Sequence, residues 1–146
     1  MIDFKKYDIL NIYDIADVER AVKGKRYKAG STLIALSATK GDVEYLDNES
    51  EVDTRYAVVT PKIECFPYYI YISIQEAFPK YISKYLTGIN LQYDNLKYLN
   101  ITVHDLETQS YIAKYFKMID MSTTRTEKEI ETIKDIKKNM LSSLIV

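Results

Sequence analysis

The stretch Gly24–Gly41 reads GKRYKAGSTLIALSATKG and contains the segment that decides the fold. At its centre, Thr32–Leu36 is a short apolar run between Gly30-Ser31 and Ser37. A run of this length between turn-forming residues is typical of a buried β-strand. The glycines, hydroxyls and lysines around it suggest contact with phosphate. They leave open whether that phosphate belongs to a nucleotide or to a DNA backbone.

The order of residues argues against a nucleotide. A P-loop requires G-x-x-x-x-G-K-[ST], with the lysine on the phosphates and the hydroxyl on magnesium. Here the fifth residue after Gly24 is Ala29, and Gly30 is followed directly by Ser31-Thr32 without a lysine. The glycines also precede the expected strand, whereas a P-loop follows a strand and opens a helix. We therefore interpret the stretch as two turns around one strand.

Further strands are expected on both sides of this one. Alternation of apolar and polar residues predicts a half-buried strand around Ile12–Ala16. Val43–Leu46 and Arg55–Thr60 are predicted strands, joined by the acidic turn Asp47–Ser50, and Pro61 is expected to end the second.

The second half of the chain is predicted to contain more helix. Apolar spacing after Pro67 predicts two short helices broken at Pro79. Thr87–Asn90 is expected to be a loop and Ile101–Val103 a last short strand.

From Asp105, a plausible N-cap, to near the C-terminus no glycine or proline interrupts the sequence. Apolar residues recur there at alternating steps of four and three, which is the heptad pattern of a coiled coil. Thr123, Thr126 and Lys137 interrupt this seam. The candidate interface residues for a partner helix are Ile112, Phe116, Ile119, Thr123, Thr126, Ile130, Ile133, Met140 and Leu144.

Composition limits the class of protein. With 47% hydrophobic and 28% charged residues, the chain is expected to fold into a globular domain. The N-terminus lacks the apolar core of a signal peptide, and no apolar run reaches the roughly 20 residues that span a bilayer. The single cysteine, Cys65, excludes an internal disulfide. We therefore expect a cytoplasmic protein without a membrane association.

The net charge is only −1, but the charges are unevenly distributed. Residues 20–41 contain six basic residues and no acidic one, and residues 42–53 contain six acidic residues and no basic one. Such blocks are usually solvated loops, and the functional alternative is a basic patch that meets DNA phosphates beside an acidic loop.

No catalytic constellation is visible. The single histidine, His104, adjoins Asp105 but has neither a nucleophile nor a third ligand beside it in the sequence. Phe66–Tyr69 lacks the acidic or amide residue and the second proline of a DNA amino-methyltransferase motif. We expect neither enzymatic activity nor a cofactor or metal site.

Four segments together resemble one half of the specificity (S) subunit of a type I restriction–modification enzyme. Ile15–Arg20, Gly24-Lys25 and Ala29–Ile34 resemble the opening of a target-recognition domain. Leu36–Gly41 resembles the turn that follows its second strand, and Thr87–Gln92 resembles its late loop. Glu107-Thr-Gln109 and the Glu, Lys and Ile repeats that run to Leu144 resemble the helix that follows each such domain.

The resemblance implies an α+β fold, in which a small mixed β-sheet domain with short helices precedes a long coiled-coil helix. Residues 1–104 would form the DNA target-recognition domain, and residues 105–146 the helix for dimerisation and subunit docking. An S subunit has no catalytic centre: it reads double-stranded DNA and directs methylation (M) subunits and, through them, nuclease (R) subunits.

A typical S subunit has two recognition domains and two helices, whereas this sequence has one of each. A natural half-subunit, a truncated gene and a fragment remain open explanations. A half-subunit would form a homodimer through its helix and recognise a symmetric, interrupted site. The alternative is a coiled-coil interaction module, or an orphan or decoy of a restriction enzyme, without a DNA role.

The DNA contacts are expected around the opening stretch and in the late loop. Lysines there can neutralise phosphates, whereas Arg26 can read a guanine edge and Asn90 and Gln92 can read adenine edges. Ser37 and Thr39 can contact bases or phosphates, and Arg55 is a candidate that is also expected to begin a buried strand. The candidate DNA-binding residues are Lys23, Lys25, Arg26, Lys28, Ser37, Thr39, Lys40, Arg55, Asn90 and Gln92.

Overall fold

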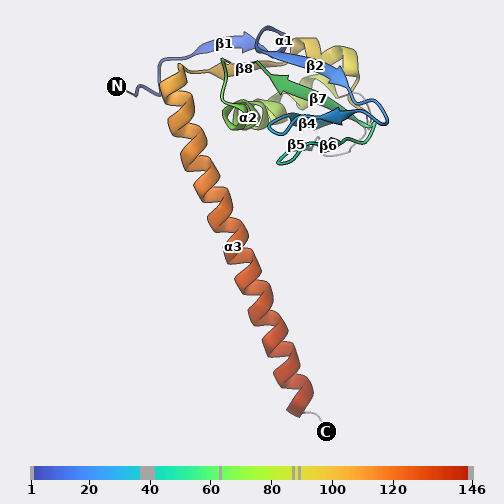
Figure 1. Cartoon of the computed structure of the whole chain (residues 1–146), viewed down its shortest axis with the longest axis vertical. Coiled ribbons are helices and arrows are strands. Elements are labelled where there is room, and N and C mark those ends of the chain that lie inside the picture. Colours follow the sequence, from blue (N-terminus) through green and yellow to red (C-terminus); the bar gives the residue numbers. More distant parts are fainter. Residues whose placement is uncertain (1, 37–41, 63, 87, 89, 145–146) are drawn as a thin grey trace. The chain divides into compact units, whose positions relative to one another are not determined.

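A computed structural model describes residues 2–36, 42–62, 64–86, 88 and 90–144 of the chain (Figure 1). It divides into two compact units, residues 1–113 and residues 114–146. The first unit holds all the strands, and the second consists of most of the long helix α3 (Leu106–Leu144).

The first unit is built on a four-stranded sheet with the order β2-β7-β4-β5. Its strands are β2 (Ala16–Arg20), β7 (Tyr56–Pro61), β4 (Thr32–Ala35) and β5 (Val43–Tyr45). The predicted strands of the opening stretch, of Val43–Leu46 and of Arg55–Thr60 are therefore confirmed, with small changes at their ends. Pro61 does end β7, where it pairs with Ala16 on the edge strand β2.

Two short strand pairs complete this unit. β1 (Asp8–Asn11) pairs with β8 (Asn100–Val103), and β3 (Arg26–Tyr27) pairs with β6 (Ser50–Glu51). The predicted last strand is thus confirmed, whereas the predicted turn Asp47–Ser50 is wrong at its end, because Ser50 lies in β6. Every strand pair among the described residues is antiparallel, which refines the expected mixed sheet.

The predicted strand at Ile12–Ala16 is wrong. Residues Ile12–Ile15 form a single helical turn, α1, between β1 and β2. The Asn11 side chain caps this turn by accepting a hydrogen bond from the Tyr13 amide at 3.0 Å. Ile12, Ile15 and Ala16 are all buried. Ile15 and Ala16 follow Ile12 by three and four residues, so all three lie on one side of a helical turn. The same spacing also resembles the alternation of an irregular strand.

Helix α2 (Pro67–Tyr85) is continuous, so the predicted break at Pro79 is also wrong. Proline removes one backbone hydrogen bond from a helix interior and costs about 3 kcal/mol. The buried side chains Ile70, Ile74, Phe78 and Tyr81 lie on both sides of Pro79 and hold the helix against the rest of the unit. Their packing outweighs the local preference.

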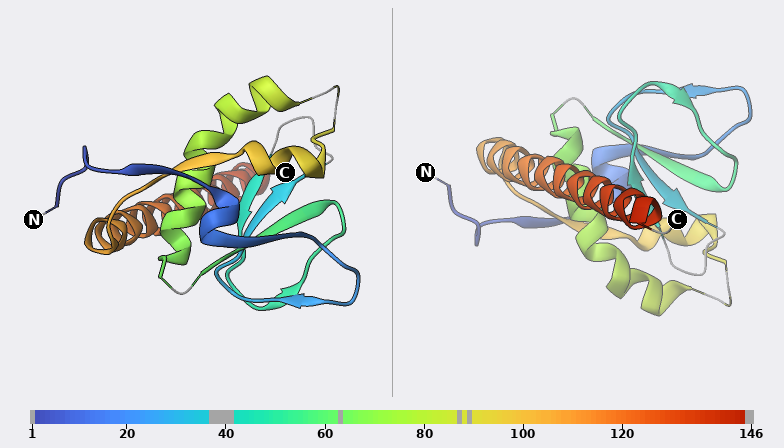
Figure 2. Two further views of the ribbon diagram at one scale, coloured as in Figure 1. Left: turned by 90° about the horizontal axis from the view of Figure 1, so that it is seen from above. Right: turned by 90° about the horizontal axis from the view of Figure 1, so that it is seen from below.

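The core lies on both faces of the sheet. On one face Ile34, Ala57 and Val59 pack with α2, which crosses the unit in Figure 2. On the other face Leu33 and Val58 form a smaller cluster with residues of the β3–β6 side. Alternate residues of β4 and β7 thus enter different clusters, as the two-residue period of a strand requires.

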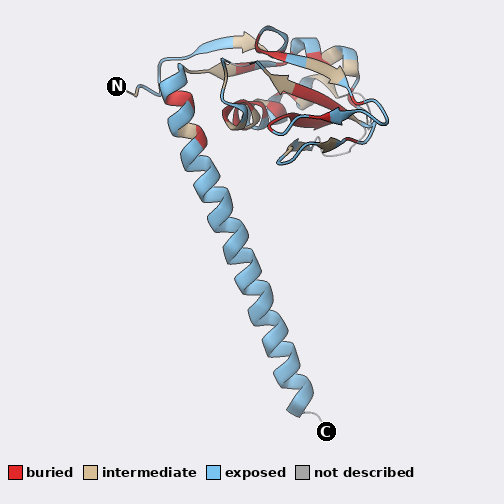
Figure 3. Cartoon of the chain, in the orientation of Figure 1, coloured by how far each residue is buried: buried red, intermediate tan, exposed pale blue. Residues whose placement is uncertain are grey.

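A 3₁₀ helix, η1 (Tyr93–Tyr98), leads into β8, and two residues separate the end of that strand from the start of α3. The Thr108 amide donates a hydrogen bond to the Asp105 carboxylate at 2.8 Å, which confirms Asp105 as the N-cap. Every described residue from Lys114 onward is exposed (Figure 3). The predicted α+β class with a long C-terminal helix is confirmed.

Candidate nucleic-acid interface

One end of the four-stranded sheet gathers segments that are far apart in the sequence. The register places the C-terminal ends of β2 and β4 beside the N-terminal end of β7, because Arg20 pairs with Ala57 and Ala35 with Tyr56. The Leu36 amide then donates to the Arg55 carbonyl at 2.9 Å, and the Leu91 amide donates to the Leu36 carbonyl at 3.0 Å. This last backbone hydrogen bond holds Leu91, in the late loop, against this end of the sheet.

A pocket of about 250 Å³ opens at the same place. The side chains of Arg55, Asn90 and Gln92, three of the predicted DNA contacts, line it together with Arg20. Leu36 and Leu91 also border the pocket, and both are buried in the core. We call this set of residues the sheet-end pocket. It offers two guanidinium groups and two carboxamides, which are the groups that form paired hydrogen bonds with base edges.

Arg55 is partly neutralised in the sheet-end pocket. Its Nε lies 3.7 Å from the Asp53 carboxylate, and its guanidinium carbon lies 5.6 Å from the centre of the Tyr56 ring. The Tyr56 hydroxyl donates to Glu44 at 3.4 Å, and burial together with Glu44 raises the pKa of Tyr56. The tyrosine therefore stays neutral at physiological pH.

The basic block around β3 is less positive than its sequence indicates. Lys25 forms an ion pair with Glu19 at 2.7 Å, and the hydrogen bond to Glu19 raises the pKa of Lys25. Arg26 lies 3.7 Å from the Glu49 carboxylate because β6 pairs with β3. Lys23 and Lys28 are exposed and make no ion pair with any other residue that the structure describes.

The predicted contacts thus fall into separate groups. Arg55, Asn90 and Gln92 come together at the sheet-end pocket, and the four basic residues from Lys23 to Lys28 lie in the segment after β2. Ser37, Thr39 and Lys40 lie outside the described residues. Arg20 also lines the sheet-end pocket but was not among the predicted contacts, because only the pairing of β2 with β7 brings it beside Arg55.

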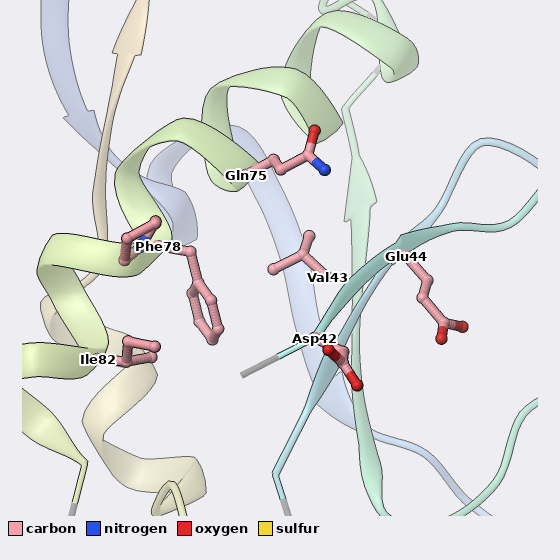
Figure 4. Close-up of a pocket in the computed structure, with 7 residues that line it drawn as sticks. Asp42, Val43, Glu44, Gln75, Phe78 and Ile82 are labelled. Carbon is pink, nitrogen blue, oxygen red and sulfur yellow. The ribbon is translucent and has the colours of Figure 1, made fainter. Parts of the chain in front are cut away.

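A second pocket, of about 380 Å³, lies between α2 and the start of β5 (Figure 4). Val43 points toward Phe78, while the carboxylates of Asp42 and Glu44 point away from α2. Two acidic groups beside the opening oppose a phosphate there, so this pocket does not extend the basic surface.

Helix α3 presents the predicted heptad seam on its surface from Phe116 onward, whereas Ile112 is half-buried and packs against the core of the first unit. Ile119, Ile133 and Met140 are each more than half exposed, as is Leu144. A groove of about 490 Å³ follows the helix and includes three seam residues, Ile119, Thr123 and Thr126. Other exposed apolar residues of α3 outside the predicted seam include Tyr115, Met118, Met121, Ile136 and Leu141.

Two further properties concern the described part of the chain. No group of three histidine, cysteine, aspartate or glutamate residues is arranged there to hold a metal ion. No helix in that part combines the length and apolar character that crossing a membrane requires.

Comparisons with known proteins relate the fold to one family. The chain is similar to the S subunit of a type I restriction–modification system from M. genitalium, at 12% identity and a TM-score of 0.73, over 86% of this chain and 42% of that one. It is similar to the HsdS subunit from Thermoanaerobacter tengcongensis, at 12% identity and a TM-score of 0.60, over 88% of this chain and 41% of that one.

A third similar chain comes from work on the assembly and conformational transition of the type I R-M system, at 14% identity and a TM-score of 0.66. The match covers 84% of this chain and 40% of that one, so this chain spans about two fifths of the length of these solved structures. No curated protein sequence matches significantly. The family model of the type I restriction modification DNA specificity domain matches residues 5–135, and the chain belongs to that family.

Proposed function

We propose that this chain reads one half of a divided DNA site, as half of a specificity subunit without catalytic activity of its own. The observation that carries the proposal is the sheet-end pocket. Arg55, Asn90 and Gln92, three of the candidate DNA contacts chosen from the sequence, line one pocket although two of them lie more than 30 residues from the third. The membership of the specificity-domain family supports the same function.

The two groups of side chains have different tasks in this proposal. Exposed lysines of the segment after β2, Lys23 and Lys28, neutralise phosphates and position the domain without reading sequence. The guanidinium and amide groups of the sheet-end pocket form paired hydrogen bonds with base edges in the major groove. Lys25 and Arg26 contribute less, because Glu19 and Glu49 compensate their charges.

The proposed partners are a second copy of the chain and the M subunits, through which R subunits join in the cytoplasm. The exposed seam of α3, including Ile119 and Ile130, supports pairing with another helix. Two copies would supply two recognition units, and the solved relatives are about twice as long as this chain. A two-fold dimer would then read a symmetric site with a spacer between its halves.

DNA binding by the full chain tests the proposal. Fluorescence anisotropy with labelled duplexes at several salt concentrations gives both the affinity and its salt slope. We expect Lys23→Glu together with Lys28→Glu to weaken binding to every duplex and to reduce the salt slope by about 2, one for each phosphate contact. Lys80→Glu with Lys84→Glu is the matched control, since both lysines are exposed on α2.

The control pair should leave the salt slope unchanged. Equal effects of both pairs would mean that the lysines act only through the net charge of the protein. A wild-type chain that binds no duplex even at low salt would overturn the DNA function. It would favour the alternative of a coiled-coil interaction module or a decoy.

A further inference from the structure

Arg20 is the guanidinium of the sheet-end pocket that has the fewest partners. It is the last residue of β2 and is exposed. Its Nε donates a long hydrogen bond of 3.4 Å to the Thr54 carbonyl. It forms no ion pair with another residue that the structure describes, whereas Arg55 in the same pocket lies beside Asp53.

This arrangement holds the start of the Arg20 side chain and leaves its two terminal nitrogens without a partner among the residues that the structure describes. The β2–β7 ladder holds its backbone, and the Thr54 carbonyl occupies its Nε. The two terminal nitrogens of a guanidinium then form a planar fork that matches two acceptors on one rigid partner. The N7 and O6 atoms of guanine are such a pair, and arginine on guanine is the commonest base-specific contact in the major groove.

The surroundings favour a base over a phosphate. The other polar groups around the pocket include the carboxamides of Asn90 and Gln92, which are neutral and carry both donors and acceptors. Such groups suit the edges of neighbouring bases, whereas a phosphate site would present donors alone.

We propose that Arg20 is a specificity-determining residue that reads a guanine of the recognised half-site through N7 and O6. The proposal rests on the DNA-reading function argued above. It names one base contact and one residue that sequence analysis did not single out. Both a guanine edge and a backbone phosphate offer a pair of acceptors to the Arg20 guanidinium. These two ligands predict different results in the following experiment.

The experiment begins by selecting preferred duplexes for the full wild-type chain from a random library. Arg20→Lys and Arg20→Gln are then measured on the selected duplex, on duplexes altered at each G·C pair, and on an unrelated duplex. Arg125→Lys on α3 is the matched control, because Arg125 is exposed in the second unit. Duplexes with 7-deazaguanine at single positions remove N7 alone.

We expect Arg20→Lys to lose about ten- to hundredfold in affinity for the selected duplex, as a bidentate arginine–guanine contact is worth 1–3 kcal/mol. Its affinity for the unrelated duplex should stay within about twofold, because the charge is kept. At one position 7-deazaguanine should weaken the wild type and leave Arg20→Lys unchanged. Arg125→Lys should behave as the wild type does.

Three results would overturn the assignment. If Arg20→Lys selects the same duplexes with the same affinities, Arg20 reads no base. If Arg20→Gln loses the same factor in affinity for every duplex while Arg20→Lys binds as the wild type does, Arg20 contacts a phosphate. If the wild-type chain binds DNA without selecting any sequence, the proposed function itself fails.

Discussion

The hydroxyl oxygen of Tyr69 lies 2.6 Å from Nδ1 of His104, although 35 residues separate them. The His104 amide also donates to this hydroxyl at 3.0 Å, and the hydroxyl reaches the Thr102 carbonyl at 3.0 Å. Nε2 of His104 in turn lies 3.0 Å from the Phe4 carbonyl. The buried Tyr69 hydroxyl therefore links α2 to β8 and, through His104, to the N-terminal segment around Phe4. This link lies directly before the start of α3.

Removal of that hydroxyl should destabilise the first unit. Tyr69 is 2% exposed, and Tyr69→Phe removes the hydrogen bonds that its hydroxyl forms with Thr102 and His104. We expect a loss of about 1–3 kcal/mol in the free energy of unfolding, measured by urea denaturation. Tyr98→Phe is the control, because Tyr98 is 48% exposed, and it should change stability by less than about 0.5 kcal/mol. Equal stability of the two variants would show that the network contributes nothing.

The two glycines that bracket the first half of the opening stretch should differ in their tolerance of a side chain. Gly24 and Gly30 both have positive φ, at +84° and +92°. A Cβ at Gly30 would lie 3.0 Å from Cβ of Pro67, whereas nothing lies within 4 Å of one at Gly24. We expect Gly24→Ala to cost about 1 kcal/mol and Gly30→Ala about 2–3 kcal/mol in thermal denaturation. Equal costs would mean that the contact with α2 relaxes freely.

One substitution in β4 should stabilise the protein. The Thr32 hydroxyl is buried, and no residue that the structure describes forms a hydrogen bond with it. Thr32→Val removes a desolvated polar atom at nearly constant shape, so we expect a gain of about 1 kcal/mol. Ser31→Ala is the contrasting variant, because the Ser31 hydroxyl donates to the Lys28 carbonyl at 2.8 Å, and it should lose about 1 kcal/mol. A loss in both variants would contradict this assignment of the Thr32 hydroxyl.

The cap of α3 should depend on pH. The hydrogen bond from the Thr108 amide lowers the pKa of Asp105 below its ordinary value of about 3.9. The stabilisation by the charged cap is therefore complete above that value and is lost as the pH falls through the lowered pKa. Asp105→Asn keeps an acceptor oxygen without the charge. The difference in melting temperature between wild type and variant should be constant from pH 7 to pH 5 and shrink toward pH 2.

The sequence predicted the elements whose pattern is local and strong. Thr32–Ala35 was recognisable because turn-forming residues border a short apolar run, and α3 because 39 residues contain neither glycine nor proline. α1 was missed because buried residues at Ile12 and Ile15 suit a helical turn as well as an irregular strand. The break predicted at Pro79 was wrong because tertiary packing keeps α2 continuous, and a local sequence pattern does not show such packing.

The candidate site shows the same limit. Arg55, Asn90 and Gln92 could be chosen by chemical type, since their side chains suit base edges. Their gathering depends on the register of β2, β7 and β4 and on the hydrogen bond from the Leu91 amide to the Leu36 carbonyl. The pairing of β3 with β6 also brings Glu49 close to Arg26. Basic and acidic residues that form separate blocks in the sequence are therefore neighbours in the folded chain.

The exposed seam of α3 predicts that the full chain associates through this helix. Ile119 and Ile130 are 57% and 48% exposed in the single chain, which is costly in water unless another helix covers them. Ile119→Asp with Ile130→Asp would place two carboxylates in the apolar interface. We expect the dissociation constant of the self-associated form to rise by at least about a hundredfold in sedimentation equilibrium, since each buried charge costs several kcal/mol.

The matched control for this change carries the same two charges away from the seam. Thr132→Asp with Ser142→Asp places them at exposed helix positions whose hydroxyls bond only to backbone carbonyls of the same helix. This variant should associate as the wild type does, and both variants should keep the thermal unfolding of the first unit. If the seam variant associates as strongly as the control, another surface joins the copies. If the wild type stays monomeric at high concentration, the seam serves a different partner, because a helix that pairs with itself must do so most readily when concentrated.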